Sequence, residues 1–233
     1  HYLFGTDTLD PPLRLPAEAL MSMWVADMQF AAPEAAMAAV RQRLEHPIFG
    51  YTMNFDDQLY EAVVAWCGRR YGWMFEREQM QTSLGVIPAL FGLVEYLTSP
   101  GEKVLALTPS YGYFKHATVQ GGRVLETSRL LEQDDGRYEI DFDDFERKVQ
   151  DPAVKLFLLC HPHNPTGRVW TEAELRRMGE LCLANDVWIV SDEIHCDLTR
   201  VGVTHVPLAR LFPDSGRIIT CMAVSKTFNL AGL

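Results

Sequence analysis

No apolar run in this sequence approaches the roughly 20 residues that a helix needs to cross a bilayer, and the first residues show no signal-peptide pattern. Low-complexity tracts, internal repeats and clusters of basic residues are also missing. The 31 acidic residues outnumber the 21 Lys and Arg residues, so the net charge is −10. Because nucleic acids are bound through a basic face, this balance argues against them as partners. We expect a cytoplasmic protein that binds neither membranes nor nucleic acid.

Cysteine is scarce, and its positions suggest neither a disulfide framework nor a metal site. The count is odd, and the residues lie mostly inside apolar segments: Cys67, Cys160, Cys182, Cys196 and Cys221. Buried reduced thiols of this kind are typical of cytosolic proteins. The histidines near residues 161–167 and 195 lack the C-x-x-C or H-E-x-x-H spacing of recognised sites, so we predict no metal. We attribute His161 and His163 to turn geometry.

Segments of strand and helix character alternate along the chain, and 48% hydrophobic residues among 233 suffice for a sizeable core. The expected strands are residues 103–107, 123–129, 138–140, 154–160, 188–192 and 217–221. The expected helices are residues 33–44, 56–71, 88–97 and 171 to about 185. This alternation predicts an α/β fold, with helices flanking a mixed, mostly parallel sheet.

Two of the expected helices carry further local signals. Thr171 and Glu174 form a capping box, which predicts the start of the helix that follows. In the helix at 56–71, three apolar residues fall on one stripe. These residues are Leu59, Val63 and Trp66.

Lys226 follows Ser225 shortly after the apolar segment 217–221. A lysine at the end of a buried strand is partly desolvated, which favours the uncharged amine that forms Schiff bases. The chemistry indicated is that of pyridoxal phosphate (PLP) bound covalently to the lysine. Lysines at strand ends more often extend to water, so this residue alone does not establish a catalytic role.

Asp192 ends the apolar segment 188–192, at the strand edge where α/β sheets place ligand groups. PLP withdraws electrons only while its ring nitrogen stays protonated, and a carboxylate paired with that nitrogen maintains the proton. Upstream, the segment 154–160 runs into a turn rich in proline, which holds Asn164 at a strand end. An ordinary proline turn would explain the same pattern.

Tyr111 lies in a third stretch of this kind, because the strand expected at 103–107 leads into the aromatic segment 108–114. An aromatic face at a strand end suits stacking on a flat heterocycle. Aromatic residues at such positions are more often plain core, so both interpretations stay open.

Taken together, these segments resemble the fold-type I PLP enzymes, the class I and II aminotransferase superfamily. The likeness covers nearly the whole chain, and its motifs occur in the family's order and approximate spacing. The strongest are Pro-His-Asn-Pro-Thr-Gly at 162–167, Ser-Asp-Glu-Ile-His at 191–195 and Ser-Lys-Thr-Phe-Asn-Leu-Ala-Gly-Leu at 225–233. The resemblance implies an aminotransferase-like large domain built around PLP.

Further segments are similar to the C–S lyase branch of this superfamily, the cystathionine β-lyase or maltose-regulator type. They are Met-Trp-Val-Ala-Asp-Met at 23–28, Phe-Gly-Tyr-Thr at 49–52, Gly-Val-Ile-Pro-Ala-Leu at 85–90 and the stretch 191–198. Ordinary aspartate aminotransferases usually lack the first of them. The branch implies elimination of a thiol from an amino-acid substrate, with pyruvate and ammonia as products. The alternatives are an amino-acid aminotransferase and, from another class, a regulatory protein with an aminotransferase-like fold.

The resemblance assigns roles to single positions of this chain. Lys226 is the expected Schiff-base lysine and proton shuttle, Asp192 the partner of the pyridine nitrogen, and Asn164 a donor to the ring's phenolic oxygen. His195 falls where many aminotransferases have a tyrosine that contacts the same oxygen, and an imidazole can donate there too. Tyr111 is the candidate for stacking on the ring.

The phosphate of the cofactor is expected at the start of the helix at 88–97, where backbone N–H groups bind an anion. These groups belong to Gly85, Val86 and Ile87. Ser225 adds a hydroxyl, but the serine that often lies three residues before the lysine is Ala223 here. Tyr51 matches the tyrosine that in this family reaches the neighbouring subunit's phosphate, which implies a homodimer.

Family members continue beyond the lysine motif with a small C-terminal domain, whose arginine binds the substrate carboxylate. The chain ends at Leu233, so we expect a fragment without that domain. The expected organisation is an N-terminal arm at 1–32 and a PLP-binding large domain at 33–233. Trp24 and Tyr51 are the remaining candidates for substrate specificity.

Overall fold

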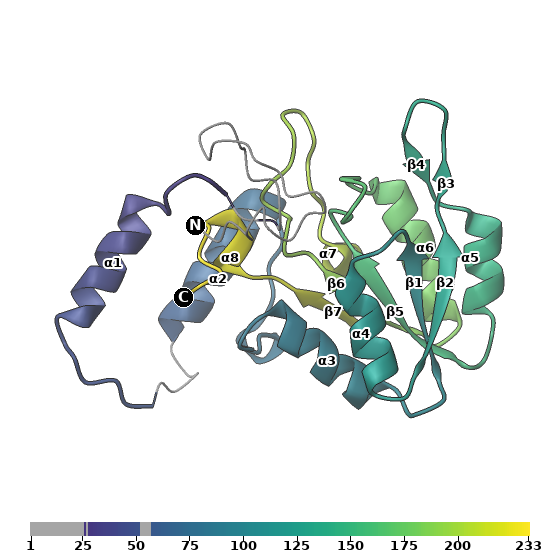
Figure 1. Cartoon of the computed structure of the whole chain (residues 1–233), viewed down its shortest axis with the longest axis horizontal. Helices are drawn as coiled ribbons and strands as arrows, with labels where there is room; N and C mark the ends of the chain where they lie inside the picture. Colours follow the sequence, from purple (N-terminus) through teal and green to yellow (C-terminus); the bar gives the residue numbers. More distant parts are fainter. Residues whose placement is uncertain (1–25, 27, 52–56) are drawn as a thin grey trace, which may run out of the picture. The chain divides into compact units, whose positions relative to one another are not determined.

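The computed structural model describes residue 26 and residues 28–51 and 57–233. The chain forms two compact units, one of residues up to 48 together with 224–233 and one of residues 49–223 (Figure 1). The smaller unit contains helices α1 (Glu34–Leu44) and α8 (Val224–Thr227). The predicted division into an arm at 1–32 and a large domain at 33–233 stays a prediction. Trp24 lies outside the described residues.

Residues 49–223 are organised around a five-stranded sheet with the order β2-β1-β5-β6-β7. Its strands are β1 (Lys103–Thr108), β2 (Val124–Arg129), β5 (Val154–Cys160), β6 (Trp188–Asp192) and β7 (Ile218–Cys221). Every pairing in this sheet is parallel. The short strands β3 (Leu131–Glu132) and β4 (Tyr138–Glu139) form a separate antiparallel hairpin. The predicted α/β class with a mostly parallel sheet is confirmed.

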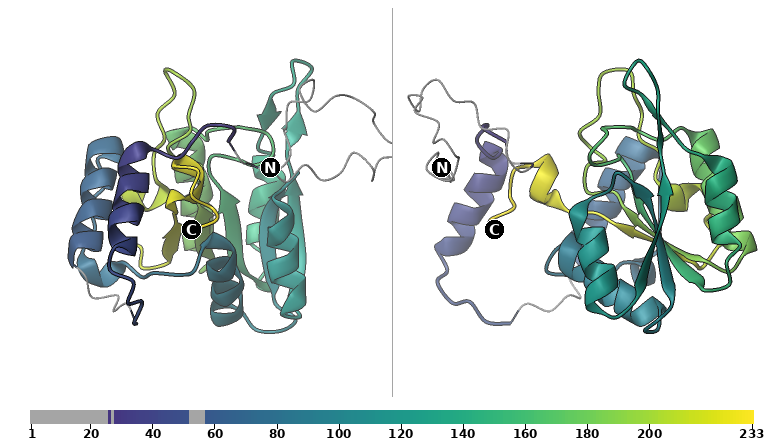
Figure 2. Two further views of the ribbon diagram at one scale, coloured as in Figure 1. Left: turned by 60° about the vertical axis from the view of Figure 1, so that its left-hand side comes forward. Right: turned by 45° about the vertical axis from the view of Figure 1, so that its right-hand side comes forward.

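Helices cover both faces of this sheet, because successive residues of a strand point to opposite sides. In β1, Leu105 and Leu107 enter one core cluster, whereas Val104 and Ala106 enter the other. The first cluster lies under α5 (Phe142–Val149), α6 (Glu172–Ala184) and α7 (Leu208–Leu211), the second under α3 (Val86–Leu97) and α4 (Gly112–Gln120). The right-hand view of Figure 2 shows these helices on the two sides of the sheet.

Helix α6 begins where its capping box predicts. The Glu174 N–H donates to Thr171 Oγ1 (3.2 Å), and the Thr171 N–H donates to Glu174 Oε2 (2.8 Å). This reciprocal pair satisfies N–H groups that the first turn of a helix would otherwise leave unbonded. The start of α6 is therefore well defined, shortly after the turn that carries Asn164.

Helix α2 (Asp57–Tyr71) follows the predicted stripe only in part. Leu59 is 46% exposed, whereas Val63 and Trp66 are partly buried and pack against the cluster of Cys67, Tyr71 and Cys196. The buried residues of this helix are Val64, Cys67 and Tyr71. Cys67 and Tyr71 pack with Cys196, which lies in the segment after β6, so the tertiary neighbour selects the buried face. A 3-10 turn, Arg77–Gln79, follows between α2 and α3.

The part of the chain that the structure describes contains no helix both long and apolar enough to cross a bilayer. The five cysteines are buried and form no disulfides, as the prediction of reduced thiols requires. Burial raises the pKa of the Cys160 and Cys221 thiols to about 12, and the neighbouring Asp192 contributes to this rise. Both thiols therefore stay protonated near neutral pH.

Candidate active site

The strand order reverses between β1 and β5, which makes this pair the topological switch point of the sheet. The chain continues from β1 to β2 on one side and from β5 to β6 on the other. Ligands of open α/β sheets bind outside the carboxyl ends of the strands at such a point. Tyr111 follows β1 and Asn164 follows β5, so the topology places two predicted cofactor residues at the same edge of the sheet.

Asp192 ends β6, one strand further along this edge. In the register of the sheet it pairs with Cys160 of β5 and Cys221 of β7, and it is only 3% exposed. Burial raises the pKa of its carboxyl to about 6; the Ile194 N–H donates to Oδ1 (3.2 Å) and opposes this rise, and the charge of Glu193 adds to it. A buried carboxyl of this kind is stabilised in its ionised form by a cationic partner.

Tyr111 precedes α4 as its N-cap residue. Burial raises the pKa of its phenol, and the nearby Asp192 carboxylate raises it further. The ring centroid lies 5.5 Å from that of Tyr113 and 6.1 Å from that of Phe114, which it meets edge-on. The ends of β1 and β6 therefore bring an aromatic ring and a buried carboxylate into one neighbourhood.

Hydrogen bonds fix the turn that carries Asn164. The Asn164 N–H donates to Cys160 Sγ (3.2 Å), and the Gly167 N–H donates to the His163 carbonyl (2.8 Å). Gly167 has a φ of +71°, which favours glycine over residues with a side chain. The His163 N–H donates to the Arg168 carbonyl (2.7 Å) and closes the turn. The predicted rigid turn is thus present directly after β5.

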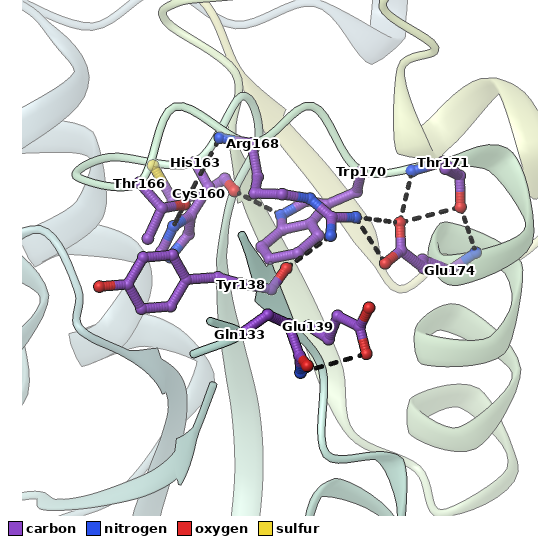
Figure 3. A network of polar contacts seen from close by, with 10 residues as sticks. All are labelled: Gln133, Tyr138, Glu139, Cys160, His163, Thr166, Arg168, Trp170, Thr171 and Glu174. Atoms are coloured by element: carbon purple, nitrogen blue, oxygen red, sulfur yellow. Dashed lines mark hydrogen bonds and ion pairs between the residues drawn. The ribbon is translucent and has the colours of Figure 1, made fainter. Parts of the chain in front are cut away.

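A polar network holds the outer side of this turn, as Figure 3 shows. Arg168 Nη2 lies 2.6 and 2.7 Å from the two carboxylate oxygens of Glu174, and Arg168 Nη1 donates to the Tyr138 carbonyl (2.5 Å). The guanidinium lies 4.8 Å from the ring of Trp170, whose Nε1–H donates to the Cys160 carbonyl (3.0 Å). Together these contacts join β4, the end of β5 and the start of α6 around Asn164's turn.

Helix α3 begins on the same face of the sheet as the side chain of Asp192. Val86 belongs to the same core cluster as the last residues of β5 and β7. Gly85 at the N-cap has a φ of +150° and, as a glycine, has no side chain that could cap this end. The first N–H groups of a helix of this length bind anions. Gly85, Val86 and Ile87 are therefore suited to a phosphate group.

Two other predicted residues lie beyond the strand ends. His195 is half-buried in the turn after β6, where its carbonyl accepts from the Leu198 N–H (3.0 Å). Tyr51 is fully exposed. Its predicted contact with a neighbouring subunit stays a prediction.

Ser225 and Lys226 belong to helix α8 of the smaller unit and are both half-buried. Lys226 Nζ donates to the carbonyl of Ala26 (3.4 Å), and Asn229 Nδ2 donates to the carbonyls of Met28 (3.1 Å) and Phe30 (2.8 Å). The lysine motif is thus held by backbone carbonyls of Ala26, Met28 and Phe30.

Sequence patterns missed a second buried group beside Asp192. Glu193 is 0% exposed, and its carboxylate accepts from His205 Nε2 (2.7 Å). The His205 ring stacks on His161 at 4.3 Å, so His161 does more than shape the turn. The Glu residue of the Ser-Asp-Glu-Ile-His motif was the one available signal, because nothing local links it to position 205. Within the described ranges, no three His, Cys, Asp or Glu side chains cluster as a metal site would.

Comparison with protein families gives a match to the class I and II aminotransferases over residues 19–233. The chain belongs to this family. The predicted resemblance is therefore confirmed.

Relatives within the family are consistent with the predicted branch. The chain is 48% identical to cystathionine beta-lyase PatB of Bacillus subtilis, over 91% of this chain and 55% of that protein. It is 31% identical to protein MalY of Escherichia coli, over 92% of this chain and 54% of that protein. The structure of a PLP-bound C–S lyase from Staphylococcus hominis matches with a TM-score of 0.89 at 47% identity, over 92% and 55% of the two chains. The chain thus spans about half the length of these relatives.

Proposed function

We propose that the chain forms the cofactor-binding part of a PLP-dependent C–S β-lyase, which releases a thiol from an amino acid and leaves pyruvate and ammonia. The main support is Asp192, a buried carboxyl with a pKa raised to about 6 at the end of β6. A protonated ring nitrogen is the cation that would offset the cost of burying its charge. The relatives named cystathionine beta-lyase and PLP-bound C–S lyase support the same assignment.

The residues at the strand ends have the chemistry to hold the ring. When bound, PLP supplies an electron sink for negative charge at the substrate Cα. Asp192 keeps the proton on the ring nitrogen, which maintains that capacity. The amide of Asn164 and the imidazole of His195 donate to the phenolic oxygen, and the ring of Tyr111 covers one face. These roles are part of the proposal.

The phosphate would bind at the start of α3. Backbone N–H groups of Gly85, Val86 and Ile87 are suited to the anion, and Ser225 adds its hydroxyl. The hydroxyl of Tyr51 completes the site from a second copy of the chain, so the working protein is a homodimer. The full exposure of Tyr51 within one chain is compatible with this contact.

Lys226 has two tasks in this proposal. Its Nζ is the covalent attachment point of the cofactor, and once the substrate amine displaces it, the free amine removes the proton from the substrate Cα. When Cβ carries a sulfur leaving group, the C–S bond would then break, and the protonated amine of Lys226 would supply the proton of the departing thiol. Water would hydrolyse the remaining aminoacrylate to pyruvate and ammonia. Without such a group the same residues support transamination, which makes an aminotransferase the alternative.

We further propose the cytoplasm as the location, which the five buried free thiols support. The substrate is a small molecule of the amino-acid class, and the acidic balance of the chain argues against nucleic acid as a partner. Salt-dependent retention on DNA would identify the regulatory alternative.

The test of the proposed function is the product formed by the complete protein. Cystathionine should give pyruvate, ammonia and a free thiol without any keto acid, because elimination returns the cofactor to its starting state. Alanine or aspartate with 2-oxoglutarate is the comparison. If cystathionine gives no thiol while 2-oxoglutarate is converted to glutamate, the protein is an aminotransferase and the lyase proposal is wrong.

A further inference from the structure

Two consecutive carboxylates at the end of β6 lie on opposite faces of the sheet. The side chain of Asp192 lies on the same face as that of Val190, two residues earlier, which belongs to the core cluster under α3 and α4. Glu193 accepts from Leu208, which belongs to the cluster under α5, α6 and α7. Both acids are buried, at 3% and 0% exposure. One carboxylate therefore faces the proposed cofactor, and the other is anchored behind it.

Three donors occupy the Glu193 carboxylate. The Ser191 hydroxyl and the Leu208 N–H donate to Oε1 over 2.9 and 3.0 Å, and His205 Nε2 donates to Oε2 over 2.7 Å. A buried carboxylate is costly unless such donors satisfy it. Because the donors come from the strand itself and from residues 205–208, the carboxylate joins two segments and has little freedom to move.

His205 extends this anchor to the neighbouring elements. Its ring stacks on His161, which follows β5, with the ring planes 28° apart. His161 Nε2 donates to the Val206 carbonyl (3.1 Å), and burial lowers the pKa of His161 to about 4, so this ring stays neutral. Tyr71 of α2 meets His205 edge-on at 5.3 Å. The ends of β5 and β6 and helix α2 thus share one buried contact group.

The peptide group that links Asp192 to Glu193 is hydrogen-bonded to both neighbouring strands. The His161 N–H donates to the Asp192 carbonyl, and the Glu193 N–H donates to the Cys221 carbonyl, both over 2.9 Å. These two bonds fix the plane of this one peptide group, whereas the side chain of Glu193 resists rotation of the strand end about its own axis. The orientation of Asp192 therefore depends on the contacts that Glu193 makes on the opposite face of the sheet.

We propose that Glu193 is a positioning residue, which fixes the end of β6 from the far face so that the Asp192 carboxylate stays against the ring nitrogen of the cofactor. This inference rests on the proposed function. The competing explanation is that Glu193 serves only the stability of the fold. The two explanations predict different protonation of the ring nitrogen in a variant that is folded and carries PLP.

The experiment uses the complete protein loaded with PLP that carries ¹⁵N in its ring, because the ¹⁵N chemical shift reports whether the ring nitrogen is protonated. Glu193→Ala removes the anchor, Glu193→Gln keeps an oxygen for Ser191 and Leu208, and Ser191→Ala removes one donor. Glu172→Ala is the control, since that carboxylate is exposed and pairs with Arg176 on the surface of α6. Melting temperature, the PLP dissociation constant, kcat and KM are measured for each.

For Glu193→Ala we expect a ¹⁵N shift moved toward the unprotonated ring, kcat lowered about tenfold or more, and KM and PLP affinity within about threefold of wild type. Glu193→Gln should restore most of both readouts, and Ser191→Ala should show a smaller change of the same sign. An unchanged ¹⁵N shift with unchanged kcat per bound cofactor, alongside a lower melting temperature, would overturn the proposal. Glu193→Gln as impaired as Glu193→Ala would overturn it too.

If Glu193→Ala does not fold, the Glu193→Gln and Ser191→Ala variants decide. A wild-type ¹⁵N shift in Ser191→Ala, with unchanged kcat, counts against the positioning role. Failure of the wild-type protein to bind PLP would contradict the proposed function itself. If Asp192→Asn alters the ¹⁵N shift and no change at Glu193 does, the proposed function stands and only this inference fails.

Discussion

The His161 N–H donates to the carbonyl oxygen of Asp192 over 2.9 Å, which joins the residue after β5 to the last residue of β6. This bond extends the parallel ladder one step beyond the end of β5. Because Asn164 lies in the turn that follows, the two strand ends that carry proposed cofactor ligands share one backbone support. A change at either end is therefore expected to affect the same site.

Replacement of Lys226 tests the covalent attachment. The complete protein with PLP should absorb in the visible, and Lys226→Ala should lose this band and turnover while it keeps its fold. Lys103→Ala is the control, since Lys103 is held by Glu126 (3.0 Å) and Asp151 (2.8 Å). After borohydride reduction, a peptide map should show the cofactor on Lys226. A label on Lys103 would refute the assignment.

Asp192→Asn should retain the cofactor and lower kcat by about 100-fold or more, because an amide does not keep the ring nitrogen protonated. We expect KM to change little. Asp186→Asn provides the control, since that side chain is 86% exposed. Near-normal turnover of Asp192→Asn would mean that another group holds the proton.

The raised pKa of Asp192 also predicts how stability depends on pH in the PLP-free protein. Between its ordinary value of 3.8 and about 6, the folded state keeps a proton that the unfolded state has released. Stability should therefore fall as pH rises through this window, by roughly 3 kcal/mol from this residue. His161 and His163, whose pKa burial lowers to about 4, act in the opposite direction.

The difference between wild type and Asp192→Asn isolates the carboxyl from these histidines. Urea unfolding at several pH values should show the stability of wild type decreasing relative to the variant as pH rises. Parallel pH curves for the two proteins would show that burial does not disfavour the ionised form of Asp192.

Mixed dimers test Tyr51. A Tyr51→Phe chain mixed with a Lys226→Ala chain should form hybrid dimers in which one site carries neither change, so activity should recover. The expected maximum is about a quarter of the wild-type value for random mixing, since half of the dimers carry one intact site of two. No recovery, with hybrid dimers verified by mass spectrometry, would place Tyr51 in the site of its own subunit.

The Arg168–Glu174 pair should support both stability and cofactor binding. Its side chains are 22% and 18% exposed, and Arg168→Met leaves Glu174 without its cation, so we expect a loss of about 2 kcal/mol in unfolding free energy. PLP affinity should also fall, because this network holds the turn of Asn164. In α6, Arg176→Met breaks a pair whose side chains are 46% and 52% exposed, and it should lower the unfolding free energy by about 0.5 kcal/mol or less. Equal losses in the two variants would contradict the structural role of Arg168.

Local patterns predicted most of the elements because they depend on neighbours in sequence. Short apolar runs identified the strands, and the capping box of Thr171 and Glu174 identified the start of α6. The stripe of α2 was predicted correctly only in part, because Val63 and Trp66 pack against the cluster that contains Cys196, whereas Leu59 is 46% exposed. Cys196 lies more than 100 residues away, so no local pattern shows which residues of the helix are buried most deeply.

The sequence by itself determined the chemistry of this protein: which strand ends carry a carboxylate, an amide and an aromatic ring, and which lysine follows the last strand. Tertiary structure alone decided the order β2-β1-β5-β6-β7, because strand pairing joins segments that no local pattern connects. It also decided the raised pKa of Asp192, which results from burial. The anchor at Glu193 depends in the same way on donors from residues 205 and 208, which folding brings to a carboxylate that has no local partner beyond Ser191.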